Sequence, residues 1–364
     1  MAKCPYCDFN SHVSTSIDQD LWADAYVKEI ERIGRETSGR LLRSVFFGGG
    51  TPSLMEPRVV DRILDAVRAT WQLANDIEIT LEANPTSVEA TRFAAYRQSG
   101  VSRISMGVQA LNDSDLRKLG RLHSAKEAIK AFDIARRHFD RVSFDLIYAR
   151  QDQTEDAWRA ELSEALSLSI DHLSLYQLTI EDGTAFGDRY AAGKLKGLPD
   201  EDRAANLFDI TQELCEKHGM PAYEVSNHAK SGSESIHNLI YWHYGDYAGI
   251  GPGAHGRLSL NGTRYATEAP RQPAKWLAAV SNNASEVREA LSADDQATEL
   301  LLMGMRVTEG VDLSRLRALS GTRYDNNINK MVDSGHVRIA EGRVQTTPAG
   351  RPLLNHVLRK ILAD

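Results

Sequence analysis

The residues of this sequence best suited to chemistry are two thiols, Cys4 and Cys7, which are separated by Pro5 and Tyr6. The chain contains only one other cysteine, so the pair does not belong to a disulfide framework. Thiols at this spacing can form a redox disulfide, supply half of a zinc site or hold part of an iron–sulfur cluster. Zinc would need two further ligands, and no second cysteine or histidine pair stands out. The four residues also match the active site of glutaredoxins, so a thiol oxidoreductase stays open as an alternative.

Composition narrows the class of protein. A chain of 364 residues can bury one large core and a smaller one. The net charge of −7 argues against a broad nucleic-acid interface, which needs a basic face. No apolar run approaches the length of about 18 residues that a membrane span requires, and the first residues lack the apolar segment of a secretory signal. These features predict a soluble cytoplasmic protein.

Strands and helices alternate from residue 20 to about residue 218, and they must position the thiols. Apolar patterning predicts strands over 41–47, 77–81, 103–109, 142–148 and 172–178. It predicts helices over 20–33, from Pro57 onward, and over 88–98, 113–119, 126–137, 154–168 and 201–218. This order is typical of an α/β fold with parallel strands and crossover helices. Polar residues at or just after the strand ends favour a (β/α) barrel, whose active face lies there: Thr51, Glu82, Gln109, Asp145 and Gln177.

The pattern changes near residue 270, so we expect one domain over 1–270 and a second over 271–364. Helices are predicted over 297–306, 313–319 and 326–332, followed by a hairpin that turns at Glu341-Gly342 and by a last helix. Helices followed by a small hairpin are typical of a winged helix. Because acids and bases are mixed in this segment, we expect a structural or partner-docking role rather than DNA binding.

Five motifs occur in a fixed order: Cys4-Pro5-Tyr6-Cys7-Asp8-Phe9, Gly48-Gly49-Gly50-Thr51-Pro52, Glu82-Ala83-Asn84-Pro85, Ser105-Met106-Gly107-Val108-Gln109 and Asp145-Leu146-Ile147-Tyr148. Together they resemble the radical S-adenosylmethionine (SAM) proteins of the oxygen-independent coproporphyrinogen III oxidase group, over nearly the whole chain. His237-Asn238-Leu239-Ile240-Tyr241-Trp242 resembles a signature of the heme chaperones in that group. On these six residues alone, a buried aromatic cluster with a hydrogen-bonded histidine is the simpler interpretation, and the resemblance favours heme binding.

The resemblance implies a partial (β/α) barrel that binds a 4Fe-4S cluster, SAM and heme, and a chaperone that delivers heme to an acceptor protein. It assigns Cys4 and Cys7 to the cluster. The SAM contacts it implies are Tyr6, Gly49, Gly50, Thr51, Glu82, Gln109, Arg121 and Asp145. The heme contacts it implies are His237, Asn238, Tyr241 and Trp242. A bare glycine backbone lets the methionine end of SAM approach closely. The sequence leaves the oligomeric state open, a homodimer included.

Three departures from the family pattern bear on function. The family motif has a further cysteine four positions before Cys4, which would precede Met1, as would the family's first barrel strand. Either the start is misassigned or truncated, or a ligand has been lost, and we expect the sequence as written to hold a cluster weakly or not at all. Cys215 shares a helix face with apolar residues, which indicates a buried structural thiol.

The other departures concern single positions. Coproporphyrinogen oxidases carry another cysteine where this chain has Phe9, which favours the chaperone over anaerobic oxidative decarboxylation. The Gly-Leu-Pro that follows the fourth strand in the family is Ala149-Arg150-Gln151 here, so we expect a reshaped loop that keeps Asp145 in place.

Overall fold

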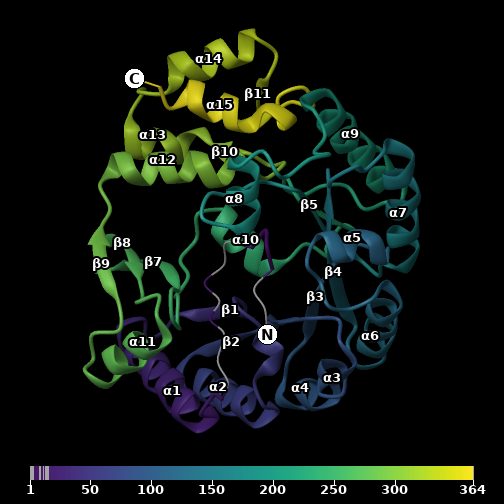
Figure 1. Ribbon diagram of the computed structural model, residues 1–364. Coiled ribbons are helices and arrows are strands. Elements are labelled where there is room, and N and C mark those ends of the chain that lie inside the picture. The colour runs from purple at the N-terminus through teal and green to yellow at the C-terminus, as the bar shows by residue number, and fades with distance from the viewer. Residues whose placement is uncertain (1–3, 8–9, 11, 13–15, 364) are drawn as a thin grey trace.

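A curved, six-stranded sheet is the centre of the molecule. The computed structural model describes residues 4–7, 10, 12 and 16–363, with the backbone alone for residues 87 and 88. The strands lie in chain order: β1 (Leu41–Phe47), β2 (Gln72–Ala83), β3 (Arg103–Gln109), β4 (Arg141–Tyr148), β5 (His172–Gln177) and β6 (Asn227–Ala229). The first five are parallel and β6 is antiparallel to β5. The sheet curls into a half-barrel with helices outside it, which confirms the predicted α/β partial barrel (Figure 1).

The two faces of this sheet differ in chemistry because side chains alternate along each strand. Leu81 and Ile104 are paired across neighbouring strands and are fully buried against the outer helices. Glu82 and Ser105 are paired one position further on and face the inside of the half-barrel. The covering helices are α1 (Gln19–Glu36), α2 (Pro57–Thr70), α3 (Ser87–Ala90), α4 (Phe93–Ser99), α5 (Asp113–Lys118), α6 (Ala125–His138), α7 (Glu155–Leu168) and α9 (Glu201–Lys217).

The helix predicted over 88–98 is wrong in one respect, since α3 and α4 are separate helices. Arg92 lies between them, and its Nη1 donates to the carbonyl oxygens of Ser53 (3.0 Å) and Leu54 (2.9 Å). Glu89 accepts the backbone N–H of Asn84 at 2.8 Å. The contacts of Arg92 to residues 39 and 38 positions earlier in the chain outweigh the helical pattern at the break.

A second sheet follows the half-barrel and was not predicted. It contains β7 (His255–Leu260), β8 (Thr263–Glu268) and β9 (Val287–Ala290), with α11 (Pro273–Ser281) between β8 and β9. These strands carry mostly polar residues, so the sequence lacks the apolar alternation of a strand. Trp22 of α1 stacks on Trp276 of α11 with ring centroids 5.6 Å apart, which fixes this unit against the half-barrel.

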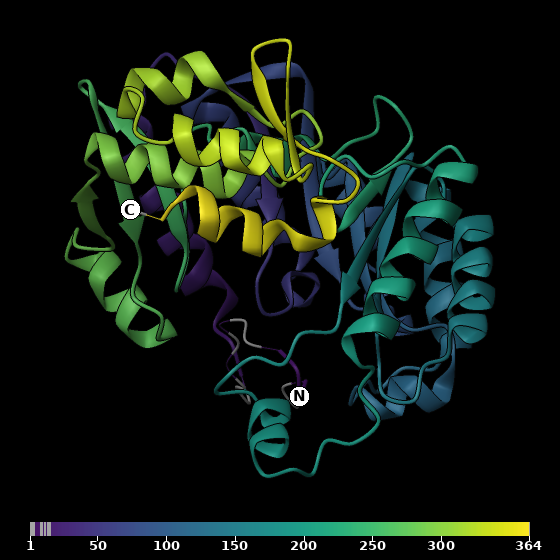
Figure 2. The same cartoon turned by 90° about the horizontal axis from the view of Figure 1, so that it is seen from above.

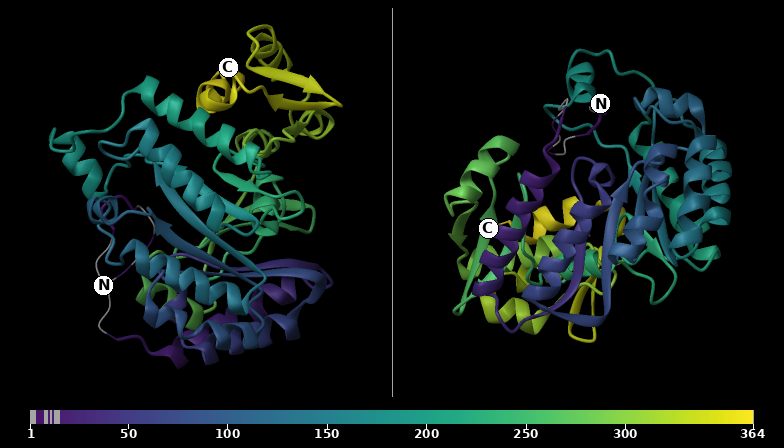
Figure 3. Two further views of the ribbon diagram at one scale, coloured as in Figure 1. Left: turned by 90° about the vertical axis from the view of Figure 1, so that its right-hand side faces the viewer. Right: turned by 90° about the horizontal axis from the view of Figure 1, so that it is seen from below.

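The C-terminal unit has the predicted order of helices and hairpin. It comprises α12 (Ala293–Gly304), β10 (Val311–Asp312), α13 (Leu313–Ser320), α14 (Asp325–Asp333), β11 (Val337–Ala340), β12 (Arg343–Thr346) and α15 (Leu354–Ile361). It has its own core and lies at one end of the half-barrel, drawn in yellow-green and yellow (Figure 3). The predicted domain boundary at residue 270 stays a prediction. Among the described residues, no helix combines the length and apolar character that crossing a membrane requires.

Candidate functional site

One cavity of about 1010 Å³ gathers most of the predicted site residues. It lies inside the half-barrel, at the carboxyl ends of its first strands and alongside β1. Every residue that the resemblance assigned to the cluster or to SAM lines this cavity: Cys4, Cys7, Tyr6, Gly49, Gly50, Thr51, Glu82, Gln109, Arg121 and Asp145. His237 lines it too, whereas Asn238, Tyr241 and Trp242 are not among its lining residues. Asp145 lies deeper than a strand end, in the middle of β4.

Residues 4–7, here called the cysteine turn, are held from two sides. The backbone N–H of Cys7 donates to the carbonyl oxygen of Cys4 at 3.1 Å, which closes the turn. The carbonyl oxygen of Pro5 accepts from the N–H of Phe186, at the start of α8 (Ala185–Ala191), at 2.8 Å. On the other side Gly120 has φ +68°, and a Cβ atom there would lie 2.6 Å from Cδ of Pro5. Figure 2 shows the first described segment of the chain, drawn in purple, beside α8.

Arg121 joins the cysteine turn to the sheet. Its Nη1 donates to Sγ of Cys4 at 3.4 Å, so the guanidinium lies directly beside one of the two thiols. Its Nη2 donates to Oδ1 of Asn84 (3.0 Å) and to the carbonyl oxygen of Gly107 (2.7 Å). Its Nε is buried and has no hydrogen-bond partner among the described residues. This orphaned cationic donor fits an anionic ligand group such as a carboxylate.

Two carboxyl groups inside the half-barrel have raised pKa values. Burial, together with the nearby Asp145, raises the pKa of Glu82 to about 7, although the N–H of Gly49 donates to its Oε2 at 3.1 Å. Burial also raises the pKa of Asp145 to about 6, against the opposing effects of Ser174, Arg103 and Arg121. Neither carboxyl forms an ion pair with another described residue, and a buried carboxylate in that situation favours a positively charged ligand. Gly49 has φ +114°, a conformation that suits glycine.

Gln109 enters the cavity because the end of β3 is irregular. Its φ of +75° lies in the left-handed region, which is costly for a residue with a side chain. The pairing of β3 with β4 shifts register between Met106 and Gln109. A residue held in this conformation at a strand end is a common feature of ligand sites.

The predicted heme motif forms a short helix, α10 (Ile236–Trp242), that packs against β1. The His237 imidazole stacks on the Phe46 ring of β1 with centroids 4.4 Å apart. Burial lowers the pKa of His237 to about 4, so the ring is neutral at neutral pH, the form that ligates metals.

The other motif residues anchor the helix. Nδ2 of Asn238 donates to the hydroxyl of Tyr223 at 3.2 Å, and Tyr241 packs edge-on against Trp242 with centroids 4.6 Å apart. The guanidinium carbon of Arg306 lies 4.6 Å from the centre of a Trp242 ring. Their contacts to heme stay a prediction, and His237 and Ile240 are the motif residues that line the cavity.

The structure adds two residues that the sequence did not single out. Oε1 of Glu78 accepts from Oγ of Ser235 (3.1 Å) and from the N–H of His237 (3.2 Å), and its Oε2 pairs with Nη1 of Arg103 (3.2 Å). Arg103 in turn acts on Asp145 through its charge. One feature of the sequence could have indicated Glu78: it is a charged residue at an inward-facing position of the predicted strand 77–81.

Cys215 lies on the buried face of α9, and burial raises the pKa of its thiol to about 12. This confirms a structural thiol that cannot serve as a ligand in the cavity. Among the described residues, no three His, Cys, Asp or Glu side chains form a metal-binding group, and two thiols reach the cavity. Phe9 lies outside the described residues, so the interpretation placed on it stays a prediction.

Comparisons with known proteins agree with this geometry. The Radical SAM superfamily model matches residues 1–164 and the HemN C-terminal domain model matches residues 291–353. The chain is 35% identical over 371 residues to "Heme chaperone HemW" of Escherichia coli (strain K12), covering 100% of this chain and 95% of that protein. It is 40% identical over 316 residues to "Radical S-adenosyl methionine domain-containing protein 1, mitochondrial" of Mus musculus, covering 85% and 71%.

Among solved structures, the fold is similar to that of coproporphyrinogen III oxidase (HemN) from Escherichia coli, described as a radical SAM enzyme. The TM-score is 0.81 at 21% identity, with 99% of this chain and 87% of that chain covered. The family-model match over residues 1–164, together with the full-length relatives, shows that this half-barrel belongs to a radical SAM protein rather than a glutaredoxin-like one. Within that superfamily, similarity along its full length shows that the chain belongs to the HemW family.

Proposed function

We propose that this protein is a heme chaperone that binds a 4Fe-4S cluster, SAM and heme, and that delivers the heme to an acceptor protein. One observation carries the proposal: His237 lines the same cavity as Cys4, Cys7 and the carboxyls of Glu82 and Asp145. A neutral imidazole is a common axial ligand of heme, and apolar walls suit the flat macrocycle. Relatives along the whole chain, named heme chaperones, support this assignment.

The proposed binding of the cluster and of SAM depends on which side chains line the cavity. Cys4 and Cys7 would supply two thiolates, one fewer than the family motif provides, and Nη1 of Arg121 donates to Sγ of Cys4. Glu82 and Asp145, once ionised, would face the positive charges of SAM, and the orphaned Nε of Arg121 fits its carboxylate. A bound radical SAM cluster supplies an electron to the sulfonium of SAM.

Heme titration of the purified protein tests the chaperone assignment. We expect a Soret change that saturates near one heme per chain, and a weaker, shifted spectrum for His237→Ala. His255→Ala is the matched control, since His255 is 52% exposed and does not line the cavity. No spectral change at stoichiometric heme would contradict the proposal. Protoporphyrinogen formation from coproporphyrinogen III in an anaerobic assay would favour the oxidase instead.

A further inference from the structure

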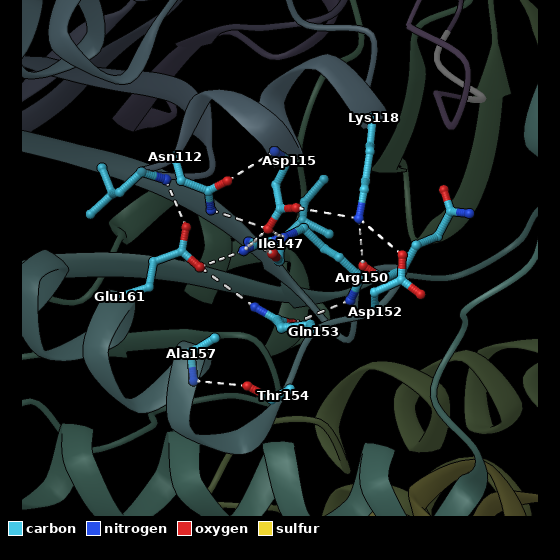
Figure 4. A network of polar contacts seen from close by, with 12 residues as sticks. Asn112, Asp115, Lys118, Ile147, Arg150, Asp152, Gln153, Thr154, Ala157 and Glu161 are labelled. Carbon is cyan, nitrogen blue, oxygen red and sulfur yellow. Dashed lines mark hydrogen bonds and ion pairs between the residues drawn. The ribbon is translucent and has the colours of Figure 1, made fainter.

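A buried ion-pair network surrounds Arg150, in the loop after β4 (Figure 4). The Arg150 side chain is 3% exposed, and its Nη2 lies 2.7 Å from Oδ2 of Asp115 on α5. The same nitrogen pairs with Oε2 of Glu161 on α7, and Nη1 donates to the carbonyl oxygen of Ile147 near the end of β4. One guanidinium therefore joins two helices to the strand that carries Asp145.

These contacts determine where α5 lies. The helix has six residues, too few to be stable without tertiary contacts. Before it, the N–H of Leu111 donates to Oε1 of Glu161 at 2.7 Å, so the residue that pairs with Arg150 also holds the entry to α5. At its other end, Nζ of Lys118 lies 3.1 Å from Oδ2 of Asp152, two residues after Arg150. The loop after β4 thus holds Asp115 and Lys118 of α5, and Glu161 of α7 holds Leu111, just before the helix.

The residues directly after α5 belong to the functional site. Gly120 packs against Pro5 so closely that a Cβ atom would lie 2.6 Å from the proline ring. The N–H of Arg121 donates to the carbonyl oxygen of Leu116 on α5 at 2.8 Å, and its guanidinium donates to Cys4. A displacement of α5 would therefore move both Gly120, which packs against Pro5, and the guanidinium of Arg121, which lies beside Cys4.

We infer that Arg150 is a positioning residue for the cysteine turn, which it holds in place through α5, Gly120 and Arg121. The inference rests on the proposed function only in that the turn it positions is the proposed cluster site. One buried cation balances the buried carboxylate of Glu161 and the partly buried carboxylate of Asp115. Loss of the cation alone therefore leaves the buried charge of Glu161 unpaired, whereas neutralising all three groups does not. A variant in which all three groups are neutral can therefore separate an effect on the position of the cysteine turn from an effect on the stability of the fold.

Alkylation kinetics of the full-length protein, freed of metal with a chelator under reducing conditions, test this inference. Mass spectrometry would follow iodoacetamide modification of Cys4 and Cys7, with the buried Cys215 as internal reference for unfolding. We expect Arg150→Met to speed modification of the turn about tenfold, as for a site whose local opening has become easier, with Cys215 still protected. Arg150→Lys, which keeps a cation, should fall between Arg150→Met and the wild type.

The decisive variant is the neutral triple Arg150→Met, Asp115→Asn, Glu161→Gln. We expect a melting temperature near that of the wild type but the fast alkylation of Arg150→Met. Gly120→Ala, which leaves the network intact and displaces Pro5 directly, should give the same fast alkylation. A triple variant with native melting and wild-type alkylation would overturn the inference.

Two control variants separate the network from general effects. Arg159→Met removes an exposed guanidinium from α7 that pairs with Glu213, and Val357→Ala weakens the C-terminal core. Neither should change the alkylation of Cys4. An increase as large as that of Arg150→Met in either control would also overturn the inference. Because no heme or SAM is needed, failure of heme binding would refute the proposed function and leave this result unaffected.

Discussion

Glu78 and Arg103 form an ion pair of 3.2 Å in which each side chain is only 4% exposed. The second oxygen of Glu78 holds the start of α10 through Ser235 and the N–H of His237. Arg103 acts on Asp145, whose pKa it lowers against the effect of burial. The helix that carries the proposed heme ligand and the carboxyl proposed to face SAM therefore share one buried pair.

Replacement of Glu78 by glutamine tests the importance of this pair. The amide oxygen can still accept from Ser235 and His237, but Arg103 loses its anionic partner in a buried position. We expect a loss of about 3 kcal/mol in the free energy of unfolding, measured by urea denaturation, because breaking a buried pair strands a charge. The double variant Glu78→Gln, Arg103→Met should recover much of that loss. Equal losses for the single and double variants would show that the pairing contributes little.

The raised pKa values of Glu82 and Asp145 predict the pH dependence of SAM binding. Ionised carboxylates attract the ammonium and sulfonium groups of SAM, and these two groups become ionised as the pH passes about 6 to 7. The affinity for SAM should therefore rise from pH 5.5 to pH 8 and then level off, as measured by calorimetry. In Glu82→Gln we expect a lower affinity and a smaller rise. A flat profile for the wild type would contradict the assignment of this pair to SAM.

Much of the half-barrel could be predicted from the sequence because its strands are defined locally. Strands β1 and β3 begin and end where continuous or alternating apolar residues predict them. Glu82 and Gln109 could be assigned to one site because parallel strands bring their carboxyl ends together.

Other features depend on contacts between residues far apart in the chain, which no local pattern contains. The bond from His237 to Glu78 joins residues 159 positions apart, so the sequence identified the heme motif without the pair that holds it. The break at Arg92 and the polar sheet of β7, β8 and β9 have the same origin. In each case tertiary contacts, rather than local propensity, determine the backbone.

The hairpin between β11 and β12 offers a test of local stability away from the site. Glu341 and Gly342 have φ values of +51° and +73°, as in a type I′ turn, and Glu341 is exposed. Asparagine tolerates this conformation better than glutamate, so Glu341→Asn should stabilise the C-terminal unit by about 0.5–1 kcal/mol. Glu341→Val, which is β-branched, should destabilise it. Thermal unfolding of both variants checks the order, and a valine variant as stable as the asparagine variant would contradict it.

Glu82→Gln also tests whether the buried carboxyl of Glu82 lowers the stability of the folded protein. The pKa of Glu82 is raised from its ordinary value of 4.5 to about 7, so between these values the native state binds more protons than the unfolded state. Stability therefore falls as the pH rises through this window, and the loss is complete above about pH 7. The glutamine variant does not carry this penalty, and its melting temperature should exceed that of the wild type by about 4 °C at pH 8 but not at pH 5. If the variant melts below the wild type at pH 8, then the carboxylate has a stabilising partner in the folded protein. The proposal that the Glu82 carboxylate needs a cationic ligand to balance it would then be contradicted.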